Sequence, residues 1–134
     1  MTSLTNIFEE FDFLGADDRY RLLIDLGRTL PVMPEPLKSD VTLVRGCSAS
    51  VWVYPVKNET GGLTFLADSN AAITKGIIAL VLKTVEGKSA TEIIATDIES
   101  ALLPFDLGSQ LSSNRTQGIP NMIALIRETA ARYI

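Results

Sequence analysis

A block of β-branched and aromatic residues in the middle of the chain constrains the fold more than any other feature. Its two runs, 51–56 and 63–66, consist mostly of Val, Trp, Tyr, Leu and Phe. Between them lies Glu59-Thr60-Gly61-Gly62, a turn sequence that contains glycine. Strand-forming runs joined by a short glycine-containing turn are typical of a β-hairpin. The sequence therefore predicts an antiparallel hairpin here.

A third strand is predicted just before the hairpin, at 41–44, where the β-branched texture begins. The residues Arg45-Gly46-Cys47-Ser48 then form the turn into the first hairpin strand. The predicted sheet is small, antiparallel and three-stranded. Cys47 is expected on a loop at its edge.

Apolar residues recur at helical spacing before this sheet. Residues 4–30 predict two short helices that separate at Gly15, with Asp17 available as an N-cap. Three prolines within 31–40 favour an extended connector, because proline fixes φ and lacks a backbone donor. Helices placed before and after a separate antiparallel sheet indicate an α+β fold.

Helical spacing returns after the sheet. Ser69 is the expected cap of a helix that ends before Gly87, and a last helix is expected to run to Tyr133. Between them, short helices are expected at 89–95 and 97–103. The chain has 134 residues, of which 46% are hydrophobic, which is enough for one core. We therefore expect a single domain over 1–134, with N-terminal and C-terminal helices flanking the sheet.

The chain has no histidine and a single cysteine, Cys47. Without an imidazole there is no Ser-His-Asp triad, no Cys-His pair and no histidine-based zinc site. A lone cysteine forms neither an internal disulfide nor a four-cysteine metal site. The sequence also has no glycine-rich phosphate loop. We therefore expect no metal site and no cofactor, which leaves carboxylate, lysine or unpaired-thiol chemistry.

The charge pattern argues against nucleic-acid and membrane partners. Sixteen acidic and 12 basic residues give a net charge of −4, without the basic cluster that phosphate binding requires. The longest apolar segment, 71–85, has about 15 residues and contains Lys75 and Lys83, whereas a membrane span needs ~20 apolar residues. The N-terminus lacks the basic and apolar run of a signal peptide. We expect a cytoplasmic protein, where a single cysteine stays reduced.

Cys47 is the candidate nucleophile, although a free cysteine is often an inert small hydrophobe in a core. Gly46 before it and the residues at 48–50 after it are small, so backbone amides can approach the sulfur. A nearby cation such as Arg45 favours the thiolate, which is the reactive form. Because the chain has no histidine to take up the proton, we expect the thiol to accept a group from a partner's chemistry, with little turnover of its own.

Arg115 and Asp68 are further candidates. Arg115 follows two serines that look like helix caps, which would put a cation in the first turn of a helix, where the helix dipole opposes it. An ion pair with Asp68 or another carboxylate would compensate. Asp68-Ser69-Asn70 ends a strand and opens a helix, so capping is the alternative interpretation of this segment.

Four groups of short motifs follow one another in a specific order. They are Tyr20 to Gly27; Val44-Arg45-Gly46-Cys47 with Val51-Trp52; Asp68-Ser69-Asn70-Ala71 with Lys75-Gly76-Ile77-Ile78-Ala79; and Leu111-Ser112 through Arg115 to Gly118. In this order they resemble the SufE family, which comprises sulfur acceptors that work with cysteine desulfurases in iron-sulfur cluster assembly. The resemblance covers nearly the whole chain. It implies a SufE/IscU-like fold with Cys47 at the nucleophile position.

The chain departs from the family pattern at four positions. The family often has Ser and Gln two and three positions after the cysteine, where this chain has Ala49 and Ser50. Asn70 stands in place of an acid. Pro120 closely follows the Arg-x-x-Gly stretch and predicts a late helix start or a kink.

The resemblance implies a persulfide relay. A pyridoxal-phosphate cysteine desulfurase takes sulfur from cysteine as its own persulfide, and Cys47 attacks the outer sulfur. The Cys47 persulfide then passes this sulfur to a scaffold or another acceptor, and the acceptor protein stimulates the desulfurase. Such thiol exchange needs a thiolate and an aligned partner sulfur but no histidine on the acceptor. Asp68 and Arg115 are hypothesised to pack near the cysteine loop and to steady or present it.

Two other functions remain open. In the first, the protein activates a desulfurase by docking alone, and Cys47 is dispensable. In the second, the protein is a structural domain whose cysteine is buried and unreactive. The position of Cys47 among small loop residues favours the sulfur acceptor.

Overall fold

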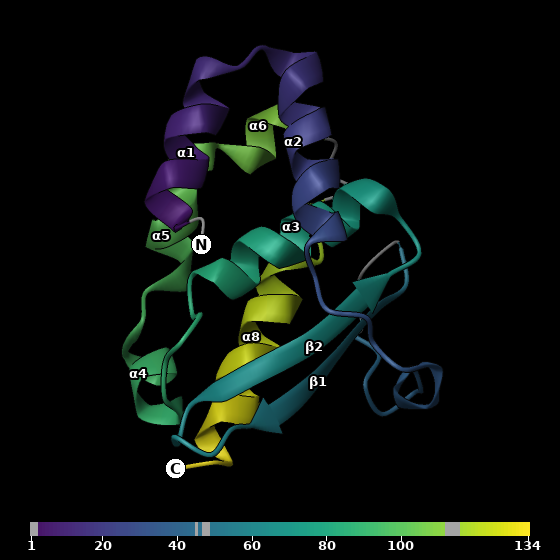
Figure 1. Ribbon diagram of the computed structural model, residues 1–134, viewed down its shortest axis with the longest axis vertical. Helices are drawn as coiled ribbons and strands as arrows, with labels where there is room; N and C mark the ends of the chain where they lie inside the picture. The colour runs from purple at the N-terminus through teal and green to yellow at the C-terminus, as the bar shows by residue number, and fades with distance from the viewer. Residues whose placement is uncertain (1–2, 45, 47–48, 112–115) are drawn as a thin grey trace.

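The computed structural model describes residues 3–44, 46, 49–111 and 116–134. The predicted hairpin is confirmed: β1 (Val51–Lys57) pairs antiparallel with β2 (Leu63–Ser69). The register sets Val51 opposite Ser69 at one end and Lys57 opposite Leu63 at the turn. The start of β1 and the end of β2 therefore lie at the same end of the hairpin (Figure 1).

The predicted third strand at 41–44 is wrong: the sheet in the described part of the chain has two strands. Leu43 forms only an isolated bridge with Trp52, framed by backbone hydrogen bonds from Val44 N to Val51 O (2.8 Å) and from Val53 N to Thr42 O (2.9 Å). The reason lies in the preceding turn. The amide of Leu43 donates to the carbonyl of Ser39 (3.0 Å), so the backbone curls into a turn where a regular ladder would need it extended.

The predicted pair of N-terminal helices is confirmed as α1 (Leu4–Phe13) and α2 (Ala16–Arg28). The N-cap of α2 is Gly15, however, and the predicted cap Asp17 lies within the first turn beside Asp18. Both carboxylates face the positive end of the helix dipole there, which stabilises the helix without a side-chain cap. After α2, the proline-containing connector is not extended throughout, because it includes a single 3₁₀ turn, η1 (Glu35–Leu37).

Helix α3 (Ala72–Lys83) packs directly on α2 at a pair of glycines. A Cβ on Gly76 would overlap the carbonyl oxygen of Leu23, and a Cβ on Gly27 would lie 2.9 Å from the amide nitrogen of Gly76. The two helix backbones can approach this closely because neither glycine has a side chain. The N-cap of α3 is Ala71, so the predicted Ser69 cap is wrong. The Ser69 hydroxyl instead accepts a hydrogen bond from Ala71 N (3.2 Å).

The C-terminal half is helical, as predicted. The elements are α4 (Ala90–Ala95), α5 (Ile98–Leu102), the 3₁₀ turn η2 (Leu103–Phe105), α6 (Leu107–Gln110) and α8 (Ile119–Ala131). Ser89 caps α4 with a complete capping box, and Asp97 caps α5. Pro120 lies at the start of α8, where proline is tolerated because the first amides of a helix have no intrahelical acceptor. The predicted serine caps at 112–113 lie outside the described residues.

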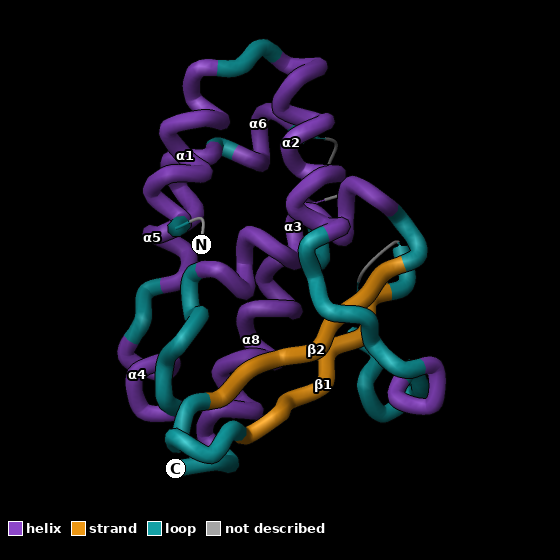
Figure 2. Tube along the Cα trace, viewed as in Figure 1, coloured by secondary structure: helices purple, strands orange, loops and turns teal. Residues whose placement is uncertain are grey.

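The core lies between one face of the hairpin and the helices. Val51, Val53, Phe65 and Ala67 point inward and are buried, whereas the alternate residues of both strands are partly exposed. Figure 2 shows α1 and α2 in the upper part of the molecule and the hairpin in the lower part, with α3 between α2 and the strands. Among the described helices, none is long and apolar enough to cross a membrane.

Candidate functional site

The site predicted from the sequence consists of Cys47, Arg45, Gly46, Asp68 and Arg115. Gly46 and Asp68 are among the described residues, whereas Cys47, Arg45 and Arg115 lie outside them.

Residues 45–49, called the cysteine segment here, connect the Leu43 bridge to the first hairpin strand. Both ends of this segment are tied to the hairpin. On the N-terminal side, Val44 N donates to Val51 O at 2.8 Å. On the C-terminal side, Ser50 and Asn70 exchange two hydrogen bonds, one from Ser50 N to Asn70 Oδ1 (3.1 Å) and one from Asn70 N to Ser50 O (3.3 Å). Asn70, a departure from the family pattern, thus supplies an acceptor at the position where an acid would supply one.

Gly46 has a backbone conformation that suits only glycine well. Its φ is +84°, in the region where an L side chain is strained. A Cβ at this position would overlap Asn121 Nδ2 on α8 and would lie 3.3 Å from Asn121 Cγ. The residue before Cys47 therefore lies directly against a side chain at the start of the last helix. The sequence gives no sign of Asn121, because no local pattern shows that α8 begins beside this loop.

Asp68 lies opposite Trp52 in the hairpin and joins three segments of the chain. Its Oδ2 is 2.6 Å from Lys38 Nζ, and its Oδ1 is 3.2 Å from Lys75 Nζ and accepts a hydrogen bond from Ser69 N at 2.8 Å. The Asp68 side chain is 17% exposed. Burial by itself raises the pKa of Asp68, but the hydrogen bonds from Lys38, Ser69 N and Lys75 outweigh it and hold the pKa below its usual value.

Lys38 extends this arrangement onto the outer face of the hairpin. Its ammonium also contacts Glu35 Oε1 at 2.9 Å and lies 5.6 Å from the centroid of the Trp52 ring, within cation–π range. The hydrogen bonds to Asp68 and then to Glu35 raise the pKa of Lys38. Trp52 is only partly buried, and the lysine lies over its ring.

The lysines revise the interpretation of Asp68. In the sequence nothing connects Lys75 with Asp68 as an ion pair, and Lys38 gives no signal at all because it lies 30 positions from Asp68. Both carboxylate oxygens of Asp68 are engaged by these two side chains. An ion pair between Asp68 and Arg115 stays a prediction, since Arg115 lies outside the described residues.

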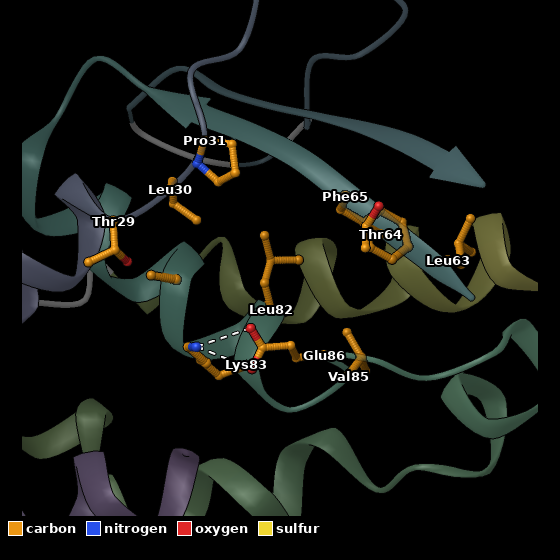
Figure 3. Close-up of a pocket in the computed structure, with 11 residues that line it drawn as sticks. Thr29, Leu30, Pro31, Leu63, Thr64, Phe65, Leu82, Lys83, Val85 and Glu86 are labelled. Carbon is orange, nitrogen blue, oxygen red and sulfur yellow. Dashed lines mark hydrogen bonds and ion pairs between the residues drawn. The ribbon is translucent and has the colours of Figure 1, made fainter. Parts of the chain in front are cut away.

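A separate pocket of about 190 Å³ lies at the other end of β2, between the end of α2 and the end of α3 (Figure 3). Leu63, Thr64 and Phe65 form one wall, and Lys83 spans the opposite side through an ion pair with Glu86 at 3.1 Å. It contains neither Gly46 nor Asp68 and is smaller than the ~300 Å³ typical of ligand sites. We assign no role to it.

Comparison with known proteins decides the family. Residues 5–130 match the SufE family, described as the Fe-S metabolism associated domain. The chain belongs to the SufE family. The match extends over nearly all of the sequence, so it includes the hairpin, the cysteine segment and all but the outermost residues of the first and last helices.

Several SufE relatives share substantial identity with the chain. An uncharacterised SufE-like protein of Rhizobium meliloti is 40% identical, covering 97% of this chain and 96% of the relative. The sulfur acceptor protein CsdE of Escherichia coli is 41% identical over 106 residues, which cover 77% of this chain and 70% of the relative. The cysteine desulfuration protein SufE of Wigglesworthia glossinidia brevipalpis is 29% identical, with 85% and 79% covered.

The fold is shared with a solved structure. The solution structure of a hypothetical protein from Thermus thermophilus superposes with a TM-score of 0.76 over 97% of this chain and 94% of the other, at 17% identity. This likeness establishes the α+β arrangement of helices and an antiparallel sheet, as predicted from the sequence, and it says nothing of activity.

Proposed function

We propose that this SufE protein is a sulfur acceptor for iron-sulfur cluster assembly. In the proposal, Cys47 takes sulfane sulfur from a pyridoxal-phosphate cysteine desulfurase, and the protein passes it to a scaffold or another acceptor. Membership of a family associated with Fe-S metabolism supports this role, as do relatives named as a sulfur acceptor and a cysteine desulfuration protein. A reducing compartment such as the cytoplasm suits a protein whose single cysteine must remain free.

The proposed step is a thiol exchange without net oxidation. The Cys47 thiolate attacks the outer sulfur of the desulfurase persulfide, a new S–S bond forms, and the S–S bond of the desulfurase persulfide breaks. The desulfurase cysteine leaves as a thiolate, and the transferred sulfur remains on Cys47 as a persulfide. Cys47 has no second cysteine in the chain to resolve this persulfide, so the sulfur must leave to another molecule.

One observation carries the proposal: the single thiol of a SufE chain lies in a short segment whose two sides are both anchored. Gly46 packs beside Asn121 on one side, and Ser50 exchanges hydrogen bonds with Asn70 on the other. A short anchored segment limits the orientations of a nucleophile, which favours alignment with a docked partner sulfur. Asp68 with its two lysines lies at the same end of the hairpin and is proposed to support this segment.

Intact-protein mass spectrometry tests the proposal. The protein is incubated with a cysteine desulfurase and free cysteine, and its mass is measured before and after addition of a reductant. We expect the wild-type protein to gain one sulfur atom, to lose it on reduction, and to stimulate desulfurase turnover. The Cys47→Ser variant, which is nearly isosteric, should gain none.

The alternatives give different results in the same experiment. If the wild-type protein gains no sulfur while desulfurase turnover still rises, the protein activates by docking alone and Cys47 is dispensable. If neither changes and the thiol of the native protein also fails to react with a small thiol reagent, Cys47 is a buried structural residue.

A further inference from the structure

The contact between Gly46 and Asn121 joins the cysteine segment to the last helix. Gly46 immediately precedes Cys47, and Asn121 is the third residue of α8. The amide of Asn121 occupies the space that a Cβ on Gly46 would need. Since consecutive Cα atoms are ~3.8 Å apart, a side chain against Gly46 is necessarily close to the backbone of Cys47.

Asn121 has no evident task in stabilising the helix or the core. The N-cap of α8 is Gly118, which supplies no side-chain hydrogen bond, and the core residues of the helix are Met122, Ile123 and Ile126. Asn121 itself is exposed, and asparagine is a weaker helix former than alanine. A polar, exposed side chain packed onto the backbone of a loop is better placed to hold the loop than to hold the helix.

Hydrogen bonds hold the two ends of the cysteine segment, and Asn121 contacts the segment between those ends. Val44 is paired to Val51 before the segment, and Ser50 is paired to Asn70 after it. These bonds fix the ends of the segment to the hairpin. The contact with Asn121 ties Gly46, between these two ends, to a helix.

We propose that Asn121 is a positioning residue for Cys47: through its packing against Gly46 it holds the residue that immediately precedes the cysteine. This inference rests on the proposed function for its biological meaning, but the placement of Asn121 can be tested by the reactivity of the thiol alone. Because Cys47 is the only cysteine, any thiol-specific reagent reports on that residue alone. The proposal is therefore testable without a desulfurase.

The first test places a charge at position 121 without changing its shape. Asn121→Asp is isosteric, and a carboxylate beside the residue that precedes Cys47 should disfavour the thiolate. We expect the pH midpoint of Cys47 alkylation by iodoacetamide to rise by about 0.3 to 1 pH unit, and the rise to shrink in 1 M salt. Lys38, Asp68 and Lys75 lie at the same end of the hairpin and are unchanged in every variant, so their effects drop out of the comparison.

Asn58→Asp is the matched control. It makes the same chemical change at an exposed asparagine in the hairpin turn, at the opposite end of the strands from the cysteine segment. The hydrogen bonds that Asn58 Oδ1 accepts from Thr60 Oγ1 and Gly62 N can be kept by a carboxylate. If Asn121→Asp moves the midpoint no more than Asn58→Asp, position 121 does not face the cysteine segment and the proposal is overturned.

The second test is a double-mutant cycle on the alkylation rate. Gly46→Ala inserts a methyl group into the space of the Asn121 amide, and Asn121→Ala vacates that space. Because the backbone strain of Gly46→Ala is the same in both backgrounds, it cancels from the coupling. We expect the effect of Gly46→Ala on the rate to be at least about twofold smaller in the Asn121→Ala background. Additive effects in variants whose circular dichroism matches wild type overturn the proposal.

Sulfur transfer separates this inference from the function on which it rests. With a desulfurase and cysteine, Asn121→Ala should lower the rate of sulfur loading on Cys47 by about threefold or more without lowering the unfolding midpoint. Wild-type protein that gains no sulfur defeats the proposed function, whereas the two alkylation tests still decide the role of Asn121. Unchanged loading by Asn121→Ala, with normal loading of the wild type, defeats the positioning role.

Discussion

Lys38 Nζ lies 2.6 Å from Asp68 Oδ2 and ties the connector between α2 and β1 to the C-terminal end of β2. Lys75 binds the other oxygen of the same carboxylate, at 3.2 Å, from the first turn of α3. The connector, β2 and α3 therefore meet at one largely buried carboxylate, two residues before Asn70. The end of the hairpin that borders the cysteine segment is fixed by charge as well as by backbone pairing.

Replacing Asp68 by asparagine should weaken this junction. The asparagine side chain would have the same shape but no negative charge for the two ammonium groups, so the charge-assisted hydrogen bonds lose strength. We expect the free energy of unfolding to fall by about 1 to 2 kcal/mol, measured by urea denaturation. The rate of sulfur loading on Cys47 should also fall in protein that is still folded. An unchanged stability would mean that water screens these ion pairs completely.

The stabilisation by Asp68 should disappear in acid. Its pKa is lower in the folded protein than the ordinary 3.8, so folding favours the carboxylate and the contribution is complete above that ordinary value. It is lost as the pH falls through the lower folded pKa, where protonated Asp68 resembles asparagine. The difference in unfolding free energy between wild type and Asp68→Asn, measured from pH 7 down to pH 2, should shrink toward zero below pH 3.8. A constant difference over this range would contradict it.

Gly76→Ala should strongly destabilise the protein. The new Cβ would overlap the Leu23 carbonyl oxygen, a backbone atom that cannot move without separating α2 from α3. Overpacking of this kind costs about 2 kcal/mol or more, read from the urea midpoint at constant slope. Gly108→Ala is the control, because no atom lies within 4 Å of the Cβ it would add. Equal stabilities of the two variants would show that the helices can move apart at little cost.

Asn70→Ala should loosen the cysteine segment on its C-terminal side. The substitution removes the acceptor of the Ser50 N–H, and the backbone bond from Asn70 N to Ser50 O then acts alone. We expect faster hydrogen exchange at the Ser50 amide and slower sulfur loading on Cys47. Asn70→Asp keeps an oxygen acceptor and should keep both near the wild-type values. If the aspartate variant behaves like the alanine variant, the acceptor at residue 70 does not matter.

The elements that local sequence patterns describe were predictable. The hairpin at 51–57 and 63–69 follows from two β-branched runs around a glycine turn, and the caps Ser89 and Asp97 stabilise their helices by contacts within four residues. The error at 41–44 arose where local and non-local hydrogen bonding compete. A β-branched run favours a strand, but the Leu43 amide is taken by Ser39 in the preceding turn.

Some residues of the candidate site were likewise predictable from the sequence, whereas others were not. The family motif around Cys47 and the segment Asp68-Ser69-Asn70 are visible in the sequence, and the Ser50 to Asn70 pairing is a consequence of the hairpin register. Lys38 and Asn121 gave no signal, because each contacts the site across a large sequence separation.

The sequence alone thus determined the chemistry available to this SufE protein: one thiol, no imidazole, and the order of helices and hairpin that carries them. Composition and local periodicity are properties of the chain itself, so they need no knowledge of which surfaces meet. Only the tertiary structure decided that Asp68 binds two lysines and that Asn121 lies against Gly46. These contacts depend on how α3, α8 and the connector pack around the hairpin, which is set by burial of the shared core and not by any one segment.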